Sequence, residues 1–207
     1  MTQIVIIKMH PNTSPSRLFI AVDISSSVKN NIESIIQSLS ASSPPHLRWD
    51  KIDKIHLTLK FLGETPFSLI NDIKEKLRDV AETISPFKIS LKGVGGFPNI
   101  EHPRVIWIGV NSNPNLESLQ KQVDLSMHKL GFTQENRPFS AHLTICRVPD
   151  FIPMENIAVL SKLIGTLETP EFGSFFVNSI HLYKSQLKPE GSSYTCQFST
   201  DLARLSA

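Results

Sequence analysis

The amino-acid sequence predicts an α+β fold of two pseudo-symmetric lobes, with mainly antiparallel sheets and outer helices around a central cleft. The order strand–helix–strand–helix–strand, read from hydrophobic period and chain breakers, occurs twice along the chain. Two landmarks recur at nearly the same offset: Arg17 and Arg104 are 104 − 17 = 87 residues apart, and His56 and His142 are 142 − 56 = 86 residues apart. An internal duplication is the simplest explanation of this repetition.

In the first copy, β-branched and aromatic runs indicate strands, and apolar residues at helical spacing indicate the helices between them. Serines at 25–27 offer N-caps to a first helix that ends at 42–45, and Pro66 opens a second helix. The strands expected are 17–23, 55–63 and 87–94. The second helix carries its apolar face on Ile70, Ile73, Leu77, Val80 and Ile84.

The second copy follows a Gly-Gly-Phe-Pro-Asn break at 95–99. Its expected elements are strands at 103–110 and 141–148, a helix over 116–130 that stops at Gly131, and a weaker helix over 154–165. The segment 173–200 is predicted to close the fold as a hairpin that turns at 188–191.

These elements set the domain boundaries that we expect. Residues 1–16 form a leader segment, and residues 17–207 form a single domain. Its repeat-equivalent halves span about 17–95 and 103–187, and the closing hairpin runs to about residue 200.

Composition narrows the class of protein. The chain has 207 residues, of which 40% are hydrophobic and 19% charged, and a formal net charge of +2. That small charge argues against binding that depends on many phosphates of a long nucleic acid, but it leaves room for one local phosphate pocket. No apolar run is long enough to span a bilayer, and the hydrophobic start is too short for a signal peptide. Cys146 and Cys196 give no disulfide or zinc framework, so we expect a cytoplasmic protein.

A His-x-Thr motif is the duplicated element that carries chemistry: His56-Leu57-Thr58 in the first copy and His142-Leu143-Thr144 in the second. Because side chains alternate along a strand, each histidine shares a face with its threonine, while the leucine points to the other face. The duplication is expected to bring two imidazoles and two hydroxyls together.

Such a set of side chains suits the opening of a phosphodiester. Imidazole titrates near neutrality, so one histidine can accept a proton while the other donates one, on opposite sides of the phosphorus. Threonine hydroxyls can donate hydrogen bonds to the non-bridging oxygens, where negative charge accumulates. We expect no metal, since neither motif contains a carboxylate and threonine is a poor metal ligand.

The sequence resembles the 2H phosphoesterase superfamily, in particular its LigT/ThpR-type RNA 2′,3′-cyclic phosphodiesterases, also called the 2′-5′ RNA ligase family. The resemblance runs along most of the chain from Arg17 onward. Its most specific parts are the two motifs with their surroundings, His56-Leu-Thr-Leu-Lys-Phe-Leu-Gly63 and Ala141-His-Leu-Thr-Ile-Cys-Arg147. Further parts are Pro103-Arg-Val-Ile-Trp-Ile-Gly109, and Leu187, Gly191 and Tyr194 in the closing hairpin.

This resemblance implies hydrolysis of an RNA 2′,3′-cyclic phosphate to a 2′-phosphomonoester without a cofactor. It implies that His56 is the proton donor and His142 the proton acceptor, with Thr58, Thr144 and Arg147 at the phosphate. The residues alone do not distinguish the acid from the base. Strict alternation also turns Arg147 away from His142, because 147 − 142 = 5 is odd, unless the strand ends or bulges near Cys146. Ala141 stands where the family usually has proline, which affects the strand entry.

Three further side chains are candidate substrate contacts. Lys60 continues the His56 face in strict alternation, Arg17 begins the first strand, and Phe19 could stack on a nucleobase. Each also has a structural interpretation, as a solvated strand end or as core packing.

The alternatives to hydrolysis are 2′-5′ RNA ligation by the reverse reaction and a non-catalytic module that binds a nucleotide or an RNA end. The expected partner is RNA with a 2′,3′-cyclic phosphate end, tRNA-derived RNA included, or a small cyclic nucleotide. A monomer is expected, because the duplication supplies both halves of the site.

Overall fold

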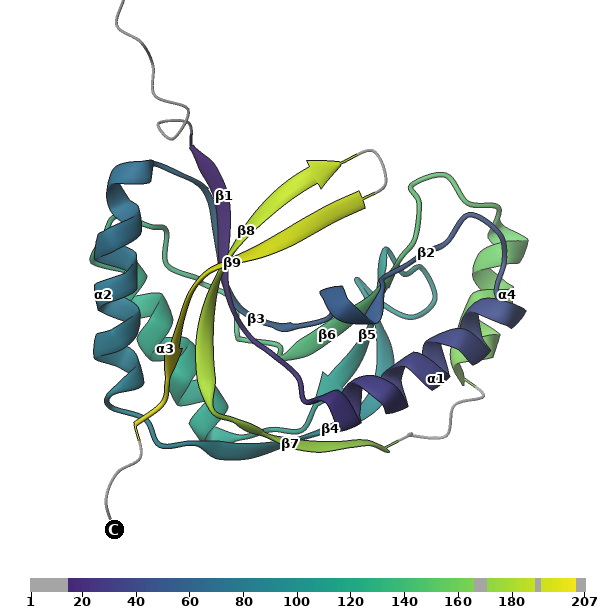
Figure 1. Cartoon of the computed structure of the whole chain (residues 1–207). Coiled ribbons are helices and arrows are strands. Elements are labelled where there is room, and N and C mark those ends of the chain that lie inside the picture. Colours follow the sequence, from purple (N-terminus) through teal and green to yellow (C-terminus); the bar gives the residue numbers. More distant parts are fainter. Residues whose placement is uncertain (1–14, 166–170, 189–190, 204–207) are drawn as a thin grey trace, which may run out of the picture.

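The computed structural model describes residues 15–165, 171–188 and 191–203. Residues 1–14 of the expected leader and residues 189–190 of the expected hairpin turn lie outside this part. Within it, the strands form two sheets whose pairings are all antiparallel, as predicted (Figure 1). The first sheet has the order β3 (Leu57–Thr65), β1 (Ser16–Val22), β8 (Ser179–Lys188) and β9 (Gly191–Asp201). The second has the order β2 (Arg48–Trp49), β6 (His142–Arg147), β5 (Val105–Val110), β4 (Phe87–Phe97) and β7 (Glu171–Val177).

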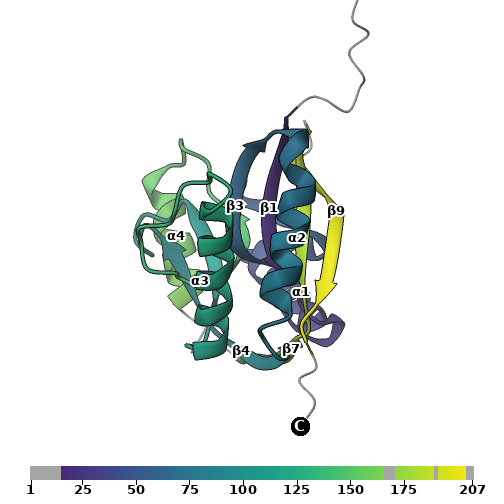
Figure 2. The same ribbon diagram turned by 90° about the vertical axis from the view of Figure 1, so that its left-hand side faces the viewer.

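Four helices of the described residues cover the two sheets in pairs. They are α1 (Ser26–Ser42), α2 (Ile70–Ala81), α3 (Pro114–His128) and α4 (Met154–Gly165). Helices α2 and α3 pack on the first sheet, where α3 contacts β3 and α2 contacts β8 and β9, while α1 contacts β7 of the second sheet and α4 (Figures 1 and 2). The outer position of the helices is therefore confirmed, and their buried faces include Ile32, Leu77 and Val123 at the predicted helical spacing.

The two copies of the repeat exchange strands between the sheets. Strand β4, the last strand of the first copy, lies in the second sheet between β5 and β7. Strand β8, from the end of the second copy, lies in the first sheet beside β1. Each sheet consequently contains strands from both copies of the repeat, and β1, β3 and β8 of the first sheet correspond to β5, β6 and β4 of the second.

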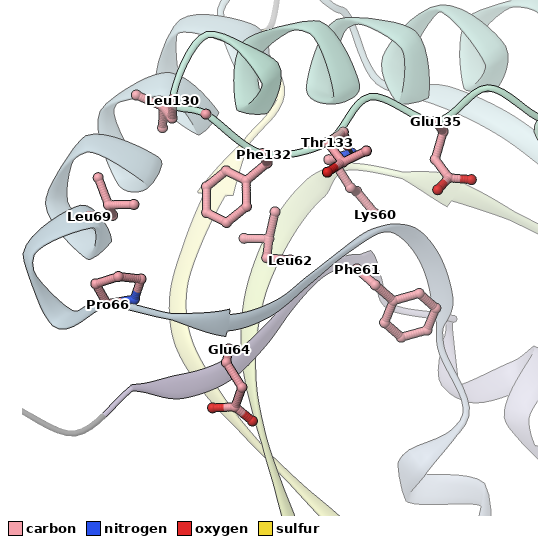
Figure 3. Close-up of a pocket in the computed structure, with 11 residues that line it drawn as sticks. Lys60, Phe61, Leu62, Glu64, Pro66, Leu69, Leu130, Phe132, Thr133 and Glu135 are labelled. Carbon is pink, nitrogen blue, oxygen red and sulfur yellow. Dashed lines mark hydrogen bonds between the residues drawn. The ribbon is translucent and has the colours of Figure 1, made fainter.

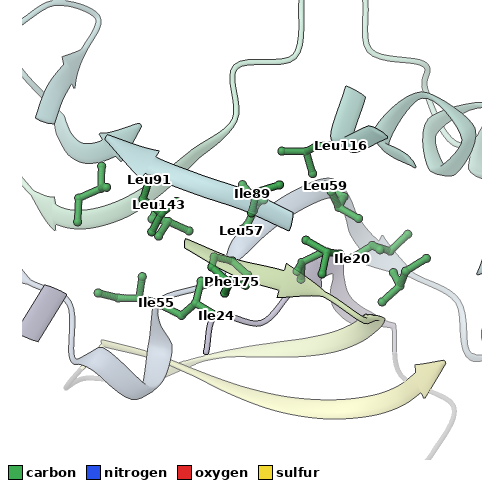
Figure 4. Packing of buried hydrophobic residues seen from close by; sticks show 14 of the residues in the cluster. Ile20, Ile24, Ile55, Leu57, Leu59, Ile89, Leu91, Leu116, Leu143 and Phe175 are labelled. Carbon is green, nitrogen blue, oxygen red and sulfur yellow. The ribbon is translucent and has the colours of Figure 1, made fainter. Parts of the chain in front are cut away.

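One continuous hydrophobic core joins the inner faces of both sheets (Figure 4). Leu57 of β3 and Leu143 of β6, the central residues of the two motifs, are both fully buried in it. Burial of the leucines fixes which face of each strand is turned outward, because neighbouring side chains point to opposite faces.

Three local predictions differ from the structure. The break expected at 95–99 begins too early, because β4 continues through Gly95 and Gly96. A side chain at Gly95 would collide with the Trp107 ring, at 2.3 Å from its Cζ2 atom, so glycine serves close packing here rather than a turn.

The hairpin expected over 173–200 consists of β8 and β9 alone, since the preceding β7 pairs with β4. Pro66 precedes a short 3₁₀ turn, Phe67–Leu69, and α2 begins only after it.

Candidate active site

His56 and His142 are held by the same local geometry. In each case, the ring nitrogen Nδ1 lies 2.7 Å from the backbone carbonyl of the residue two positions earlier, Lys54 for His56 and Ser140 for His142. A carbonyl oxygen only accepts, so Nδ1 carries the proton in both rings and Nε2 is left for chemistry. The sequence predicts the pair of histidines but not these two carbonyls. Lys54 ends a short 3₁₀ turn, Ile52–Lys54, just before β3, and Ser140 lies in the loop just before β6.

A β-bulge follows each motif at the same repeat position. In β3, Ala21 pairs with Thr58 and Ile20 with Lys60, so Leu59 is an extra residue. In β6, Trp107 pairs with Thr144 and Ile106 with Cys146, so Ile145 is extra. The two extra residues are 145 − 59 = 86 positions apart, the offset of the histidines.

The bulges decide which later side chains share a face with the histidines. After Ile145, the buried Cys146 points into the core and Arg147 returns to the exposed face that Thr144 occupies. Of the two arrangements that strict alternation left open for Arg147, the structure therefore has the bulge. We call the face with His56, Thr58 and Phe61 on β3, and the face with His142, Thr144 and Arg147 on β6, the site faces.

Lys60 does not lie on the site face, contrary to the expectation from strict alternation. The bulge at Leu59 turns it to the opposite side, where it is 4% exposed and forms an ion pair with Asp124 of α3. The side chain that takes its place on the site face is Phe61, the repeat equivalent of Arg147, and it is 71% exposed.

The two threonines and Arg17 occupy positions compatible with their predicted roles. Thr58 and Thr144 are partly exposed on the site faces, two residues beyond their histidines. Arg17 is exposed at the start of β1, opposite Ser185 of β8. Their contacts with a substrate stay predictions.

Aromatic side chains pack around the His56 ring. Phe19 is stacked on it, with ring centroids 4.7 Å apart, and Tyr194 meets it edge-on at 5.2 Å. Tyr183 stacks behind Phe19 at 5.4 Å, and its hydroxyl donates to Asp23 at 2.8 Å. Phe19 is only 3% exposed, so it supports the imidazole instead of offering a free face to a nucleobase.

His142 has a smaller aromatic support. The ring of Phe97, at the end of β4, meets it edge-on with centroids 5.0 Å apart, and Trp107 lies at 6.4 Å. For Phe97, the sequence alone favours core packing over a contact with a nucleobase. Its position depends on β4 joining the second sheet, a pairing that no local pattern indicates.

Burial is the main influence on the charge of His56. Desolvation lowers the pKa of His56 below its ordinary 6.5, and the nearby charge of Arg147 lowers it further, while the Lys54 carbonyl and the Asp23 carboxylate act in the opposite direction. Arg147 belongs to the second sheet and His56 to the first. The charge of Arg147 therefore acts on His56 from the other sheet.

Arg147 is itself placed by the short strand β2. The Arg147 Nε atom lies 4.0 Å from the Asp50 carboxylate, and the Asp50 amide donates to the carbonyl of the bulged Ile145 at 2.9 Å. Burial raises the pKa of Asp50 and that of the adjacent Cys146 thiol, the latter to about 12, so Cys146 is not a nucleophile at neutral pH.

The described residues hold neither a candidate metal cluster nor a candidate membrane span. No group of three or more His, Cys, Asp or Glu side chains in this part of the chain is arranged to hold a metal ion. Within the same residues, no helix is both long and apolar enough to cross a membrane.

Comparison with known proteins places this chain in a family. The model of the family described as LigT like Phosphoesterase matches residues 22–107 and again residues 108–194. The two matches begin 108 − 22 = 86 residues apart, which is the offset of the duplicated motif.

Curated and solved relatives agree with this match. The chain is 35% identical over 179 residues to a Methanothermobacter thermautotrophicus protein named RNA 2′,3′-cyclic phosphodiesterase, a match covering 86% of this chain and 95% of that protein. The crystal structure of TT0787 of Thermus thermophilus has a TM-score of 0.72 at 26% identity, covering 90% of this chain and 97% of the other. E. coli LigT complexed with 3′-AMP has a TM-score of 0.67 at 27% identity, covering 92% and 99%. The chain therefore belongs to the LigT-like phosphoesterases of the 2H superfamily, as its paired motifs predict.

Proposed function

We propose that this protein hydrolyses 2′,3′-cyclic phosphodiester ends of RNA to 2′-phosphomonoesters, with His56 and His142 as the acid and the base. The observation that carries the proposal is the matched pair of imidazoles, each oriented by a carbonyl 2.7 Å from its Nδ1 atom. The name of the Methanothermobacter relative supports the substrate, and the 3′-AMP complex of E. coli LigT supports a nucleoside phosphate as its ligand.

In the proposed reaction, Nε2 of His142 accepts a proton from a water molecule whose oxygen attacks phosphorus. The bond from phosphorus to O3′ breaks, and His56 gives its Nε2 proton to O3′. Thr58, Thr144 and Arg147 stabilise the charge that develops on the non-bridging oxygens. Exchange with solvent then returns both histidines to their starting protonation states.

The lowered pKa of His56 fits this role only with a substrate bound. Burial favours the neutral ring in the free protein. A phosphodiester anion between the site faces opposes that effect, because a nearby negative charge stabilises the imidazolium. Binding of the substrate is thus expected to charge the proton donor where it is needed.

The exposed Phe61 offers a place for the nucleobase. It lies on the site face five residues beyond His56 and has an exposed ring, whereas Phe19 is covered. One chain supplies all of these groups, so we propose that a monomer is active. We propose the cytoplasm as its compartment, in keeping with the unpaired Cys146 and Cys196.

The test is turnover of an RNA that ends in a 2′,3′-cyclic phosphate, in the presence of EDTA. The wild-type protein should release a 2′-phosphate end, and His56→Ala and His142→Ala should each lower kcat by roughly 10²–10⁴-fold. His102→Ala, which removes an exposed histidine away from the motifs, serves as the matched control and should retain full activity. Full activity of His142→Ala would contradict the two-histidine mechanism, and activity that disappears with EDTA would indicate a metal.

A further inference from the structure

A buried ion pair joins the strand of His56 to helix α3. Lys60 and Asp124 are 4% and 5% exposed, and the Lys60 Nζ atom lies 2.5 Å from Asp124 Oδ1. Lys60 also donates to the backbone carbonyl of Thr133 at 2.8 Å. Charges buried this deeply are costly unless their partners are complete, so the pair has a defined geometry. Lys60 is also one of the residues that line a pocket of about 400 Å³ between β3 and the segment after α3 (Figure 3).

This pair anchors the segment 133–141, which leads from α3 back to His142. The amide of Glu135 donates to both carboxylate oxygens of Asp124, at 3.3 Å each. The side chains of residues 134–138 are exposed. Several hydrogen bonds connect residues 133–140 to other elements. They include the bonds to Lys60 and Asp124, and the bond that the His142 ring donates to the Ser140 carbonyl.

The ion pair and the segment 133–141 lie between the two histidines along the chain. Lys60 lies in β3, four residues after His56, which directly precedes this strand. Ser140, near the end of the segment 133–141, provides the carbonyl that orients His142. The repeat equivalent of Lys60 is the neutral, buried Cys146, since 146 − 60 = 86. The second copy therefore has no ion pair at the equivalent position.

We propose that the Lys60–Asp124 pair is a positioning element that sets the orientation of His142 relative to His56 by anchoring the segment 133–141. The proposal rests on the two-histidine function proposed above. A displacement of a catalytic group by about 1 Å is enough to lower a rate by about 10²-fold.

Two single variants test the anchor. Lys60→Met keeps most of the side-chain volume without the charge, and Asp124→Asn keeps the shape of the acceptor. Each should lower kcat for the cyclic-phosphate RNA by about 10- to 100-fold. KM should change by less than about 2-fold, because Thr58, Thr144 and Arg147 are untouched. Lys76→Met is the matched control: it removes an exposed lysine–aspartate pair on α2, with Asp79 at 2.6 Å, and should leave kcat unchanged.

A double variant separates positioning from stability. Lys60→Met with Asp124→Leu replaces both charges by apolar groups, which restores stability that either single variant loses. It leaves the Thr133 carbonyl and the Glu135 amide without their partners, so kcat should stay low. Recovery of kcat together with the melting temperature would show that the pair is merely structural and would overturn the proposal.

Two NMR measurements decide the question without any activity. In Lys60→Met, the rate of hydrogen exchange of the Glu135 amide with solvent should rise by about 10-fold or more. The preference of the His142 ring for the tautomer protonated at Nδ1 should weaken, while the tautomer preference of the His56 ring should not change. If the wild-type protein did not turn over the RNA, the proposed function would be wrong. The two NMR measurements would still test whether the ion pair positions His142. Unchanged Glu135 exchange and an unchanged His142 ring in folded Lys60→Met would refute the positioning role.

Discussion

The two histidines are alike in sequence and in their Nδ1 bonds, but their surroundings differ. His56 stacks on the buried Phe19 and lies near the Asp23 carboxylate, which Tyr183 holds by a hydrogen bond. The repeat equivalent of Asp23 is Gly109, since 109 − 23 = 86, so His142 has no carboxylate at that position. The duplicated motif predicts two equivalent imidazoles, whereas their environments make them chemically distinct.

Burial of His56 predicts that the protein loses stability in mild acid. The pKa of His56 is lower in the folded state than the ordinary 6.5, so the unfolded chain binds more protons between these two values. The free energy of unfolding should therefore fall as the pH drops through 6.5, and this loss should level off below the folded pKa. Urea unfolding of wild type and His56→Gln from about pH 8 to about pH 5.5 measures the effect. The variant should show the smaller pH dependence, and equal slopes would contradict the assignment.

At the scale of a strand, the duplicated bulge decides which residues belong to the site. The alternation of His-x-Thr predicts the faces of Thr58 and Thr144, because both lie before the bulge. Beyond it, alternation is wrong for Lys60 and Arg147, since one extra residue reverses every later side chain. In β6, the carbonyl of the extra residue Ile145 accepts a hydrogen bond from the amide of Asp50, which directly follows the distant strand β2. A contact between segments so far apart in the chain leaves no signal in a local hydrophobic pattern.

The placement of Arg147 beyond this bulge gives a second electrostatic prediction. Because the Arg147 charge lowers the pKa of His56, Arg147→Gln should raise that pKa in the free protein. The same variant should lower kcat/KM for a cyclic phosphate by about 10²-fold, since a charged donor to the phosphate is lost. NMR titration of the His56 ring checks the first effect, with Arg104→Gln as a control that removes an arginine paired with Asp150. If the His56 titration is the same in both variants, Arg147 does not face His56.

At the scale of the whole molecule, the sequence shows the internal repeat, but it does not show which strands pair with one another. Periodicity located most elements to within a few residues, because each amphipathic helix and strand carries its own apolar face. Which sheet β4 or β8 joins depends on pairs of residues far apart in the chain. Phe87 of β4 pairs with Val177, 177 − 87 = 90 positions later, and Ala21 of β1 pairs with His181, 181 − 21 = 160 positions later. This exchange brings Tyr183 of β8 near His56 and Phe97 of β4 near His142, two side chains for which the sequence alone favours core packing.

The exchange of strands predicts that neither half of the chain folds alone. A fragment of residues 1–101 contains β4 without its neighbours β5 and β7, and β1 without β8. It also lacks α3, which covers β3, so the buried face around Leu57 would be exposed to water. We expect no cooperative urea transition for fragments 1–101 or 102–207 alone, and recovery of the near-UV circular dichroism of the intact protein when they are mixed in equal amounts. A cooperative transition in the isolated first fragment would mean that each copy of the repeat is an independent domain. If neither fragment folds alone, and the mixture recovers both structure and turnover, the site exists only when the two copies fold as one unit.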